Sequence, residues 1–238
     1  MAKETATYQQ LQVVIREEGC PICRLGLAAV GVYLDTMLWE SSTDLNVHAM
    51  VTASLGFCGR HSRELLTYGG QRLGAAVLER AALLAAQQRL PALVAAAAES
   101  APQRVPFWAR PGPVAQGTVE RWSLPEGVQP CPACVRQAEE ERRGVDELLA
   151  HLDELAPALL AAGGLCLPHL LMAARVAKEA QRQRLLAIEQ QAWAALGEEL
   201  ESFISQHKSH RHGEPISERA RAALERTITS LTGEYPVR

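Results

Sequence analysis

The amino-acid sequence predicts an all-α protein. Ala and Leu, the strongest helix formers, dominate the composition, whereas aromatic residues make up only 5% of the 238 residues. Apolar residues recur at helical spacing, and no stretch shows the alternation of apolar and polar residues typical of a half-buried strand. Hydrophobic residues make up 47% and charged residues 21%, an ordinary composition for a folded soluble protein. We therefore expect packed helices.

Glycine and proline mark the ends of the helices expected in the first half. Gly19 ends a first helix, and Pro21 suits the first turn of a second one, where its missing N–H costs nothing. Gly56 stops a third helix, and a long fourth one is expected to be interrupted at Gly69-Gly70 and bent at Pro91. These helices cover about residues 8–18, 21–38, 45–54 and 59–98.

The second half is expected to be organised in the same way. One helix begins at Pro132, and a second runs through 147–162 and stops at Gly163 and Gly164. Two more are expected over 168–207 and 217–231. Between the halves, residues 99–130 hold six prolines and three glycines, which helix cannot tolerate. We predict a first helical repeat over 1–98, an irregular proline-rich linker over 99–130 and a second repeat over 131–238.

The cysteines recur in one pattern. Cys-Pro-x-Cys, followed after a gap by Gly-[Phe/Leu]-Cys-x-x-His, occurs twice and uses all six cysteines. The gap between the two motifs is similar in both copies, 35 positions in the first and 32 in the second. Such self-similarity predicts two pseudo-symmetric repeats. The candidate ligands are Cys20, Cys23, Cys58, His61, Cys131, Cys134, Cys166 and His169.

These motifs favour metal binding for a chemical reason. Each pair is expected at the start of a helix, where spacing of three places both side chains on one side of a turn. Free N–H groups and the helix dipole stabilise a thiolate there, and the thiolate is the form that binds metal. Three sulfurs and one nitrogen match a closed, tetrahedral zinc site. We expect two zinc ions per chain.

The pairing of the motifs has two solutions. Joining the motifs within each repeat closes the shorter loops, which costs less entropy. We therefore predict one site from the Cys20 and Cys58 motifs and another from the Cys131 and Cys166 motifs. The exchanged arrangement, in which the Cys-Pro-x-Cys of one repeat meets the Cys-x-x-His of the other, is also compatible with the sequence.

Two other uses of the cysteines stay open. An iron–sulfur cluster, serving as a redox sensor or electron carrier, also takes thiolate ligands. A thiol–disulfide oxidoreductase would use Cys-x-x-Cys at a helix start, although this chain lacks the strands that accompany such sites and its Cys-x-x-His motifs would go unexplained. Buried, apolar cysteines are the simplest alternative, but they give no reason for paired spacing.

Charge and composition narrow the function class. The net charge is −3, and no basic block predicts a nucleic-acid surface. The N-terminal residues are polar and the apolar run over 83–98 is short and interrupted, so we expect a cytoplasmic protein with no membrane contact. No catalytic motif is present, which favours binding to an unknown protein partner, or self-association, over enzyme activity. The charged run 139–143 is interpreted as a solvated helix face.

The four motifs resemble those of a bacterial family of unknown function. They stand here as Gly19-Cys-Pro-Ile-Cys23, Gly56-Phe-Cys-Gly-Arg-His61, Cys131-Pro-Ala-Cys134 and Gly164-Leu-Cys-Leu-Pro-His169, and none of the paired positions is missing. The resemblance covers residues 19–169, with weaker similarity near 214–215. It supports the duplication and implies no activity.

Overall fold

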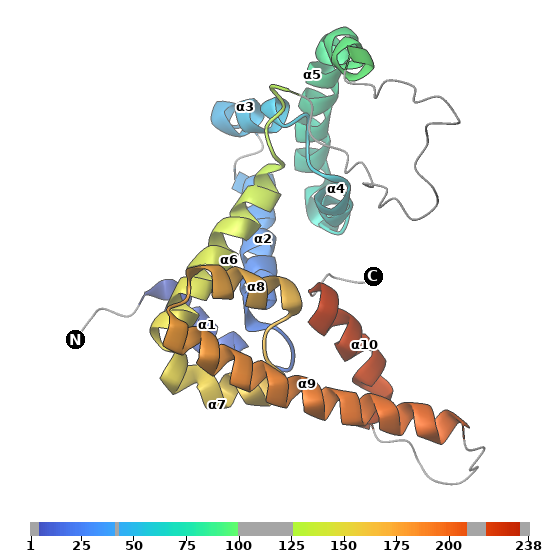
Figure 1. The fold of residues 1–238 in the computed structure, drawn as a ribbon. Coiled ribbons are helices and arrows are strands. Elements are labelled where there is room, and N and C mark those ends of the chain that lie inside the picture. Colours follow the sequence, from blue (N-terminus) through green and yellow to red (C-terminus); the bar gives the residue numbers. More distant parts are fainter. Residues whose placement is uncertain (1–4, 41–42, 100–125, 209–217, 234–238) are drawn as a thin grey trace. The chain divides into compact units, whose positions relative to one another are not determined.

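The computed structural model describes residues 5–40, 43–99, 126–208 and 218–233, and within these ranges the chain is helical without a strand (Figure 1). The all-α prediction is therefore confirmed. The helices are α1 (Ala6–Val14), α2 (Pro21–Glu40), α3 (Leu45–Ala53), α4 (Gly59–Leu65), α5 (Arg72–Glu99), α6 (Pro132–Ala150), α7 (Leu152–Ala162), α8 (Leu167–Val176), α9 (Glu179–Lys208) and α10 (Glu218–Thr232), with a 3-10 turn at Gly69–Gln71.

Both of the expected long helices are interrupted. The helix expected over 59–98 is interrupted at Gly69, at the glycine pair where an interruption was expected, and Pro91 lies inside α5. The helix expected over 168–207 is divided into α8 and α9 by Ala177, whose backbone is extended. Gln181 caps the new helix by accepting the Lys178 N–H at 2.8 Å. This break contains neither glycine nor proline, so no local signal in the sequence predicts it.

The residues group into two compact units. Unit 1 comprises Met1–Val30 and Arg136–Arg238, and unit 2 comprises Gly31–Val135, so that α2 and α6 contribute residues to both. The expected division into 1–98 and 131–238 stays a prediction; in this grouping residues 1–30 lie with most of the second half, and residues 131–135 lie with the rest of the first. Residues 100–125 of the expected linker lie outside the described ranges.

Unit 1 is built around a contiguous apolar core. Helix α9 packs along α7, and α10 packs on α9 and α8 (Figure 1). The start of α2 lies close to α6, since a Cβ at Gly144 would meet Leu25 Cδ1 at 2.7 Å. The buried residues of this core come from α1, α2, α6, α7, α8 and α9, and they include Leu11, Ile22, Leu148, Leu159 and Leu185.

Unit 2 is more open. Its α3 packs against α5, and among the described residues those that are buried and apolar are fewer than in unit 1, among them Leu34, Val51, Leu65 and Leu78. Along α5 many large apolar side chains are exposed. Those more than half exposed are Leu73, Leu83, Leu90 and Val94. The described part of unit 2 therefore buries less apolar surface than that of unit 1, and the hydrophobic contribution of these residues to stability is smaller.

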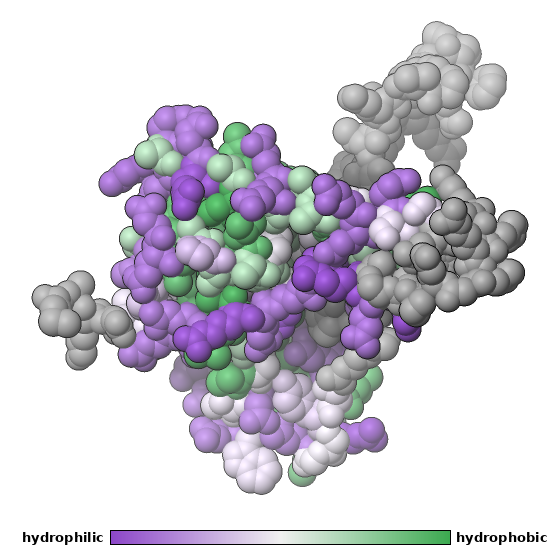
Figure 2. All heavy atoms as spheres, turned by 90° about the horizontal axis from the view of Figure 1, so that it is seen from below, coloured by the Kyte–Doolittle hydropathy of each residue, from purple (hydrophilic) through white to green (hydrophobic). Residues whose placement is uncertain are grey.

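Two helices reach the length and hydropathy of a membrane span. They are Pro21–Glu40, 44% buried in its most apolar window, and the stretch Gly69–Ala98, only 6% buried. Core helices of soluble proteins pass the same test, so two such helices are weak evidence for a membrane. The protein face seen in Figure 2 mixes hydrophilic and hydrophobic side chains over its described part.

Candidate metal centres

Each candidate ligand pair lies at the beginning of a helix, as its motif predicts. Cys58 is the N-cap of α4 and Cys166 the N-cap of α8, both with extended backbone, and neither side chain caps its own helix. The sulfurs are therefore free of the usual N-cap bond. His61 and His169 follow three residues later, on the first turn. Cys20 directly precedes α2, and Cys131 directly precedes α6.

A glycine in the left-handed region precedes both Cys-x-x-His motifs. Gly56 has φ +97° and Gly164 has φ +85°, a conformation that other residues adopt only at a steric cost. At Gly164 a side chain is also excluded by contact, because a Cβ there would overlap the Glu189 carboxylate. These turns bring each motif cysteine out of the preceding segment and into its cluster.

The ligand atoms gather into two clusters, each within one unit. We call the cluster in unit 1 site A; it consists of Cys20, Cys23, Cys166 and His169. We call the cluster in unit 2 site B; it consists of Cys58, His61, Cys131 and Cys134. In each cluster all four ligand atoms lie within 4.8 Å of one another. All eight candidates are thus brought together.

The pairing within repeats is wrong, and the exchanged arrangement is the one observed. Cys23 Sγ lies 3.6 Å from Cys166 Sγ across 143 positions of sequence, and Cys58 Sγ lies 3.6 Å from Cys134 Sγ across 76. The prediction rested on the entropy cost of loop closure, but each doubling of loop length costs only about 0.6 kcal/mol. Packing of α2 against α6 outweighs a difference of this size.

The distances in site A fit a single tetrahedral ion. His169 Nδ1 lies 3.5 Å from Cys20 Sγ, 3.3 Å from Cys23 Sγ and 3.1 Å from Cys166 Sγ. With bonds of about 2.3 Å to sulfur and about 2.0 Å to nitrogen, a tetrahedral zinc site has edges of about 3.8 and about 3.6 Å. The sulfurs are too far apart for a disulfide, whose S–S bond is about 2.05 Å.

Site B has the same ligand geometry. His61 Nδ1 lies 3.3 Å from Cys58 Sγ, 3.5 Å from Cys131 Sγ and 3.4 Å from Cys134 Sγ. In both sites the histidine uses Nδ1 and leaves Nε2 pointing away from the sulfurs. The two clusters therefore offer the same three sulfurs and one nitrogen at the same separations, and either could hold a metal ion.

The surroundings of the two histidines differ. In site A, His169 Nε2 lies 3.4 Å from Glu141 Oε2, and the other carboxylate oxygen accepts a hydrogen bond from Gln137 at 2.6 Å. A carboxylate behind a ligating histidine fixes its tautomer and makes its free nitrogen a better ligand. In site B, His61 Nε2 is buried and has no hydrogen-bond partner among the described residues.

Crowding of the thiols perturbs their protonation. In site A, contact with Cys166 raises the pKa of the Cys23 thiol far above its usual range, because three thiolates this close repel one another. In site B, the hydrogen bond from Cys134 is the largest cause that lowers the pKa of Cys131, to about 3. A divalent cation is what would allow all three thiols of a cluster to ionise together.

Two acidic residues near site A were missed by the sequence analysis. Glu141 lies in the run interpreted as a solvated face, yet its side chain is only 12% exposed. It precedes the buried Val145 by four positions and Leu148 by seven, so helical periodicity could have placed it on the buried face. Glu189 accepts the Leu165 N–H at 2.6 Å and so holds the turn before Cys166.

The protein was compared with known families, curated proteins and solved structures. Neither the curated proteins nor the solved structures gave a match. Residues 1–238 match the model of a family described as "Family of unknown function (DUF6062)". The match spans the whole chain, including all four motifs on which the resemblance rested, and the chain therefore belongs to this family.

Proposed function

We propose that the protein binds one zinc ion in site A and one in site B, as closed structural centres. The proposal is carried by a single observation: each cluster collects four ligand atoms from two distant motifs to within 4.8 Å. Burial of apolar cysteines alone gives no reason for such convergence, whereas a tetrahedral ion requires it. Structural zinc contributes on the order of 10 kcal/mol or more, comparable to the stability of a small domain.

Ligand spacing favours a single ion over an iron–sulfur cluster. A cluster of two or four irons has to fit between its ligands, which then stand farther apart than around one ion. Sulfur–sulfur distances of 3.6 Å in both sites leave space for one ion. Iron bound singly by the same ligands would colour the protein, so a visible spectrum separates it from zinc.

Burial argues against thiol–disulfide exchange at site A. A redox-active cysteine needs an accessible thiolate that a substrate disulfide can reach. Cys20, Cys23 and Cys166 are at most 5% exposed, and each lies next to a histidine nitrogen. A metal ligand set accounts for both the burial and the histidine.

The role that we propose for the zinc protein is to bind a partner protein in the cytoplasm. The apolar side chains exposed along α5 support this role, because exposed apolar patches mark interaction surfaces. Self-association through that helix is one form of it. The cysteine-rich centres fit a reducing compartment, in which thiols stay available for metal.

Elemental analysis of protein purified without oxygen tests the proposal, together with its visible spectrum. We expect two zinc ions per chain, no visible band and a partial loss of helical structure after chelation. Iron accompanied by sulfide and a broad visible absorbance would contradict it. Protein with neither metal, but with rapidly alkylated thiols, would favour the oxidoreductase alternative.

A further inference from the structure

We infer that site B is the exchangeable metal centre of this protein and that site A releases its ion much more slowly. The inference rests on the proposed function, that both sites bind zinc, and adds a division of roles between them. The ligand geometry is the same in the two sites, so any difference in how readily they release an ion has to come from what surrounds the ligands.

The first difference is access to the sulfurs. All four ligands of site A are buried, and its three cysteines belong to the apolar core of unit 1. In site B, Cys58 and Cys134 are partly exposed, and neither belongs to that core. A competing ligand has to reach a bound ion before it can displace a thiolate. Partly exposed sulfurs allow this approach more readily than buried ones do.

The second difference is the support behind the histidine. Glu141 holds His169 from behind, and Gln137 holds Glu141 in turn. His61 has no such partner among the described residues. Glu141 lies ten positions after Cys131, and ten positions after Cys20 the sequence has Val30, which cannot accept a hydrogen bond. Removing a partner of this kind weakens metal binding by about 10–100-fold.

The third difference is a cover over site A. Gly233, at the end of α10, lies directly over its sulfurs: a Cβ there would be 3.6 Å from Cys23 Sγ and 3.8 Å from Cys166 Sγ. Site A adjoins a cavity of about 770 Å³, which Cys20 and Cys166 line together with residues of α10. Helix α10 therefore bounds the space through which a chelator would approach site A.

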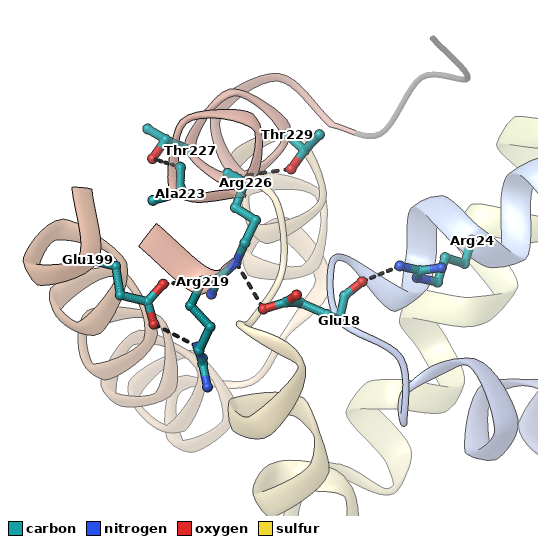
Figure 3. Close-up of polar contacts among 8 residues, drawn as sticks. All are labelled: Glu18, Arg24, Glu199, Arg219, Ala223, Arg226, Thr227 and Thr229. Carbon is teal, nitrogen blue, oxygen red and sulfur yellow. Dashed lines mark hydrogen bonds and ion pairs between the residues drawn. The ribbon is translucent and has the colours of Figure 1, made fainter. Parts of the chain in front are cut away.

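Ion pairs hold this cover in place (Figure 3). Arg226 of α10 contacts Glu199 of α9 and lies 2.9 Å from Glu18 in the segment before α2. Arg219 adds a second contact to Glu199 at 3.0 Å. The Arg226 and Glu199 side chains are only 18% and 22% exposed, so water screens their attraction less than that of a surface pair.

Release from site B requires no redox change. The ion passes to a competing ligand, and the thiolates that held it take up protons from the solvent. Because the described part of unit 2 buries less apolar surface than that of unit 1, its helices depend on the ion more than those of unit 1 do. Exchange at site B therefore controls the folding of unit 2 and leaves unit 1 intact.

Metal release from the full-length, zinc-loaded protein tests the inference. We would add the coloured chelator 4-(2-pyridylazo)resorcinol in excess and follow zinc transfer, with N-ethylmaleimide labelling of the freed thiols mapped by mass spectrometry. We expect two phases at least about tenfold apart in rate. Cys58, Cys131 and Cys134 should be labelled in the fast phase, and Cys20, Cys23 and Cys166 in the slow one.

A matched pair of variants assigns the phases independently. Cys58→Ser should abolish the fast phase, and Cys166→Ser should abolish the slow one. Should a variant fail to fold, labelling of the unmodified protein decides alone. Release of both ions at one rate, or earlier labelling of site A, would overturn the inference while leaving zinc binding intact. Protein that takes up no zinc would overturn the proposed function and this inference together.

Discussion

Sites A and B offer a metal ion the same four ligand atoms at nearly the same separations, but in different environments. Site A lies in the core of unit 1, with Glu141 behind its histidine and α10 over its sulfurs. Site B lies in unit 2, with two partly exposed cysteines and no partner for His61 Nε2 among the described residues. The comparison teaches that the ligand set decides which ion is bound, whereas the surroundings decide how firmly it is held.

Removal of both ions should have the largest effect and should separate the two units. Unit 1 keeps a contiguous apolar core without metal, whereas unit 2 loses much of what orders it, since a structural ion supplies on the order of 10 kcal/mol. Hydrogen exchange of the chelated protein should find α3 and α5 unprotected and α7 and α9 still protected. Equal loss of protection in both units would mean that the cores do not differ as described.

Replacing the carboxylate behind His169 should make site A more like site B. Glu141→Gln keeps the shape of the side chain but removes its charge, so we expect zinc affinity at site A to fall by about 10–100-fold, with site B unchanged. Competition with a chelator of known affinity measures the change. Glu139→Gln, on the same helix but 45% exposed, is the matched control and should leave both affinities unaltered.

Glu189, which holds the turn before Cys166 of site A, should make the stability of the folded protein depend on pH. Burial raises the pKa of its carboxyl to about 7, above the value of about 4.3 expected in the unfolded chain. The native state therefore holds this proton over a pH range in which the unfolded chain has lost it. The resulting stability is fully present below about pH 4 and is lost as pH rises through about 7.

Glu189→Gln removes this dependence. The free energy of unfolding of the Glu189→Gln variant, relative to that of the unmodified protein, should increase by about 1 kcal/mol between pH 6 and pH 8, as measured by urea unfolding of the zinc-loaded proteins. Glu79→Gln is the counterpart on the side of site B. Glu79 lies within 3.5 Å of the Ser62 hydroxyl, and burial raises its pKa as well. A difference that stays constant with pH would show that Glu189 is ionised in the native protein.

Loosening the cover should have the smallest effect. Arg226→Met keeps the length of the side chain but removes both of its ion pairs, so we expect zinc release from site A to quicken a few-fold while release from site B does not change. Partly screened pairs of this kind contribute on the order of 1 kcal/mol. Arg219→Met, at a side chain that is 70% exposed, is the control. Equal rates of zinc release from site A in Arg226→Met and the unmodified protein would show that α10 does not slow this release.

Sequence and structure agree where the signal is local. Helix starts at Pro21 and Pro132, and all eight ligands, follow from short motifs whose chemistry is contained within one helical turn. The break at Ala177 was not predictable in this way, because it depends on a buried backbone position and a cap from Gln181. A local sequence pattern does not predict the structure where tertiary packing favours one of several conformations that are similar in energy.

The pairing of the motifs shows the same limit. Closing the shorter loops was favoured by about 2 kcal/mol in total, from roughly two doublings of loop length at site A and one at site B. Contacts between segments far apart in sequence, such as Leu25 against Gly144, decide the matter instead. The burial of Glu141 was not predicted for a related reason: a charged run is interpreted as solvent-exposed as long as the helix that packs against it is unknown.

The exchanged pairing is tested most directly by counting zinc in two double variants by native mass spectrometry. Cys20→Ser with Cys166→Ser removes two ligands of site A only, so this protein should keep one ion. Cys20→Ser with Cys58→Ser damages both sites and should keep none. The opposite result, one ion in the second variant and none in the first, would mean that the motifs pair within their own repeats.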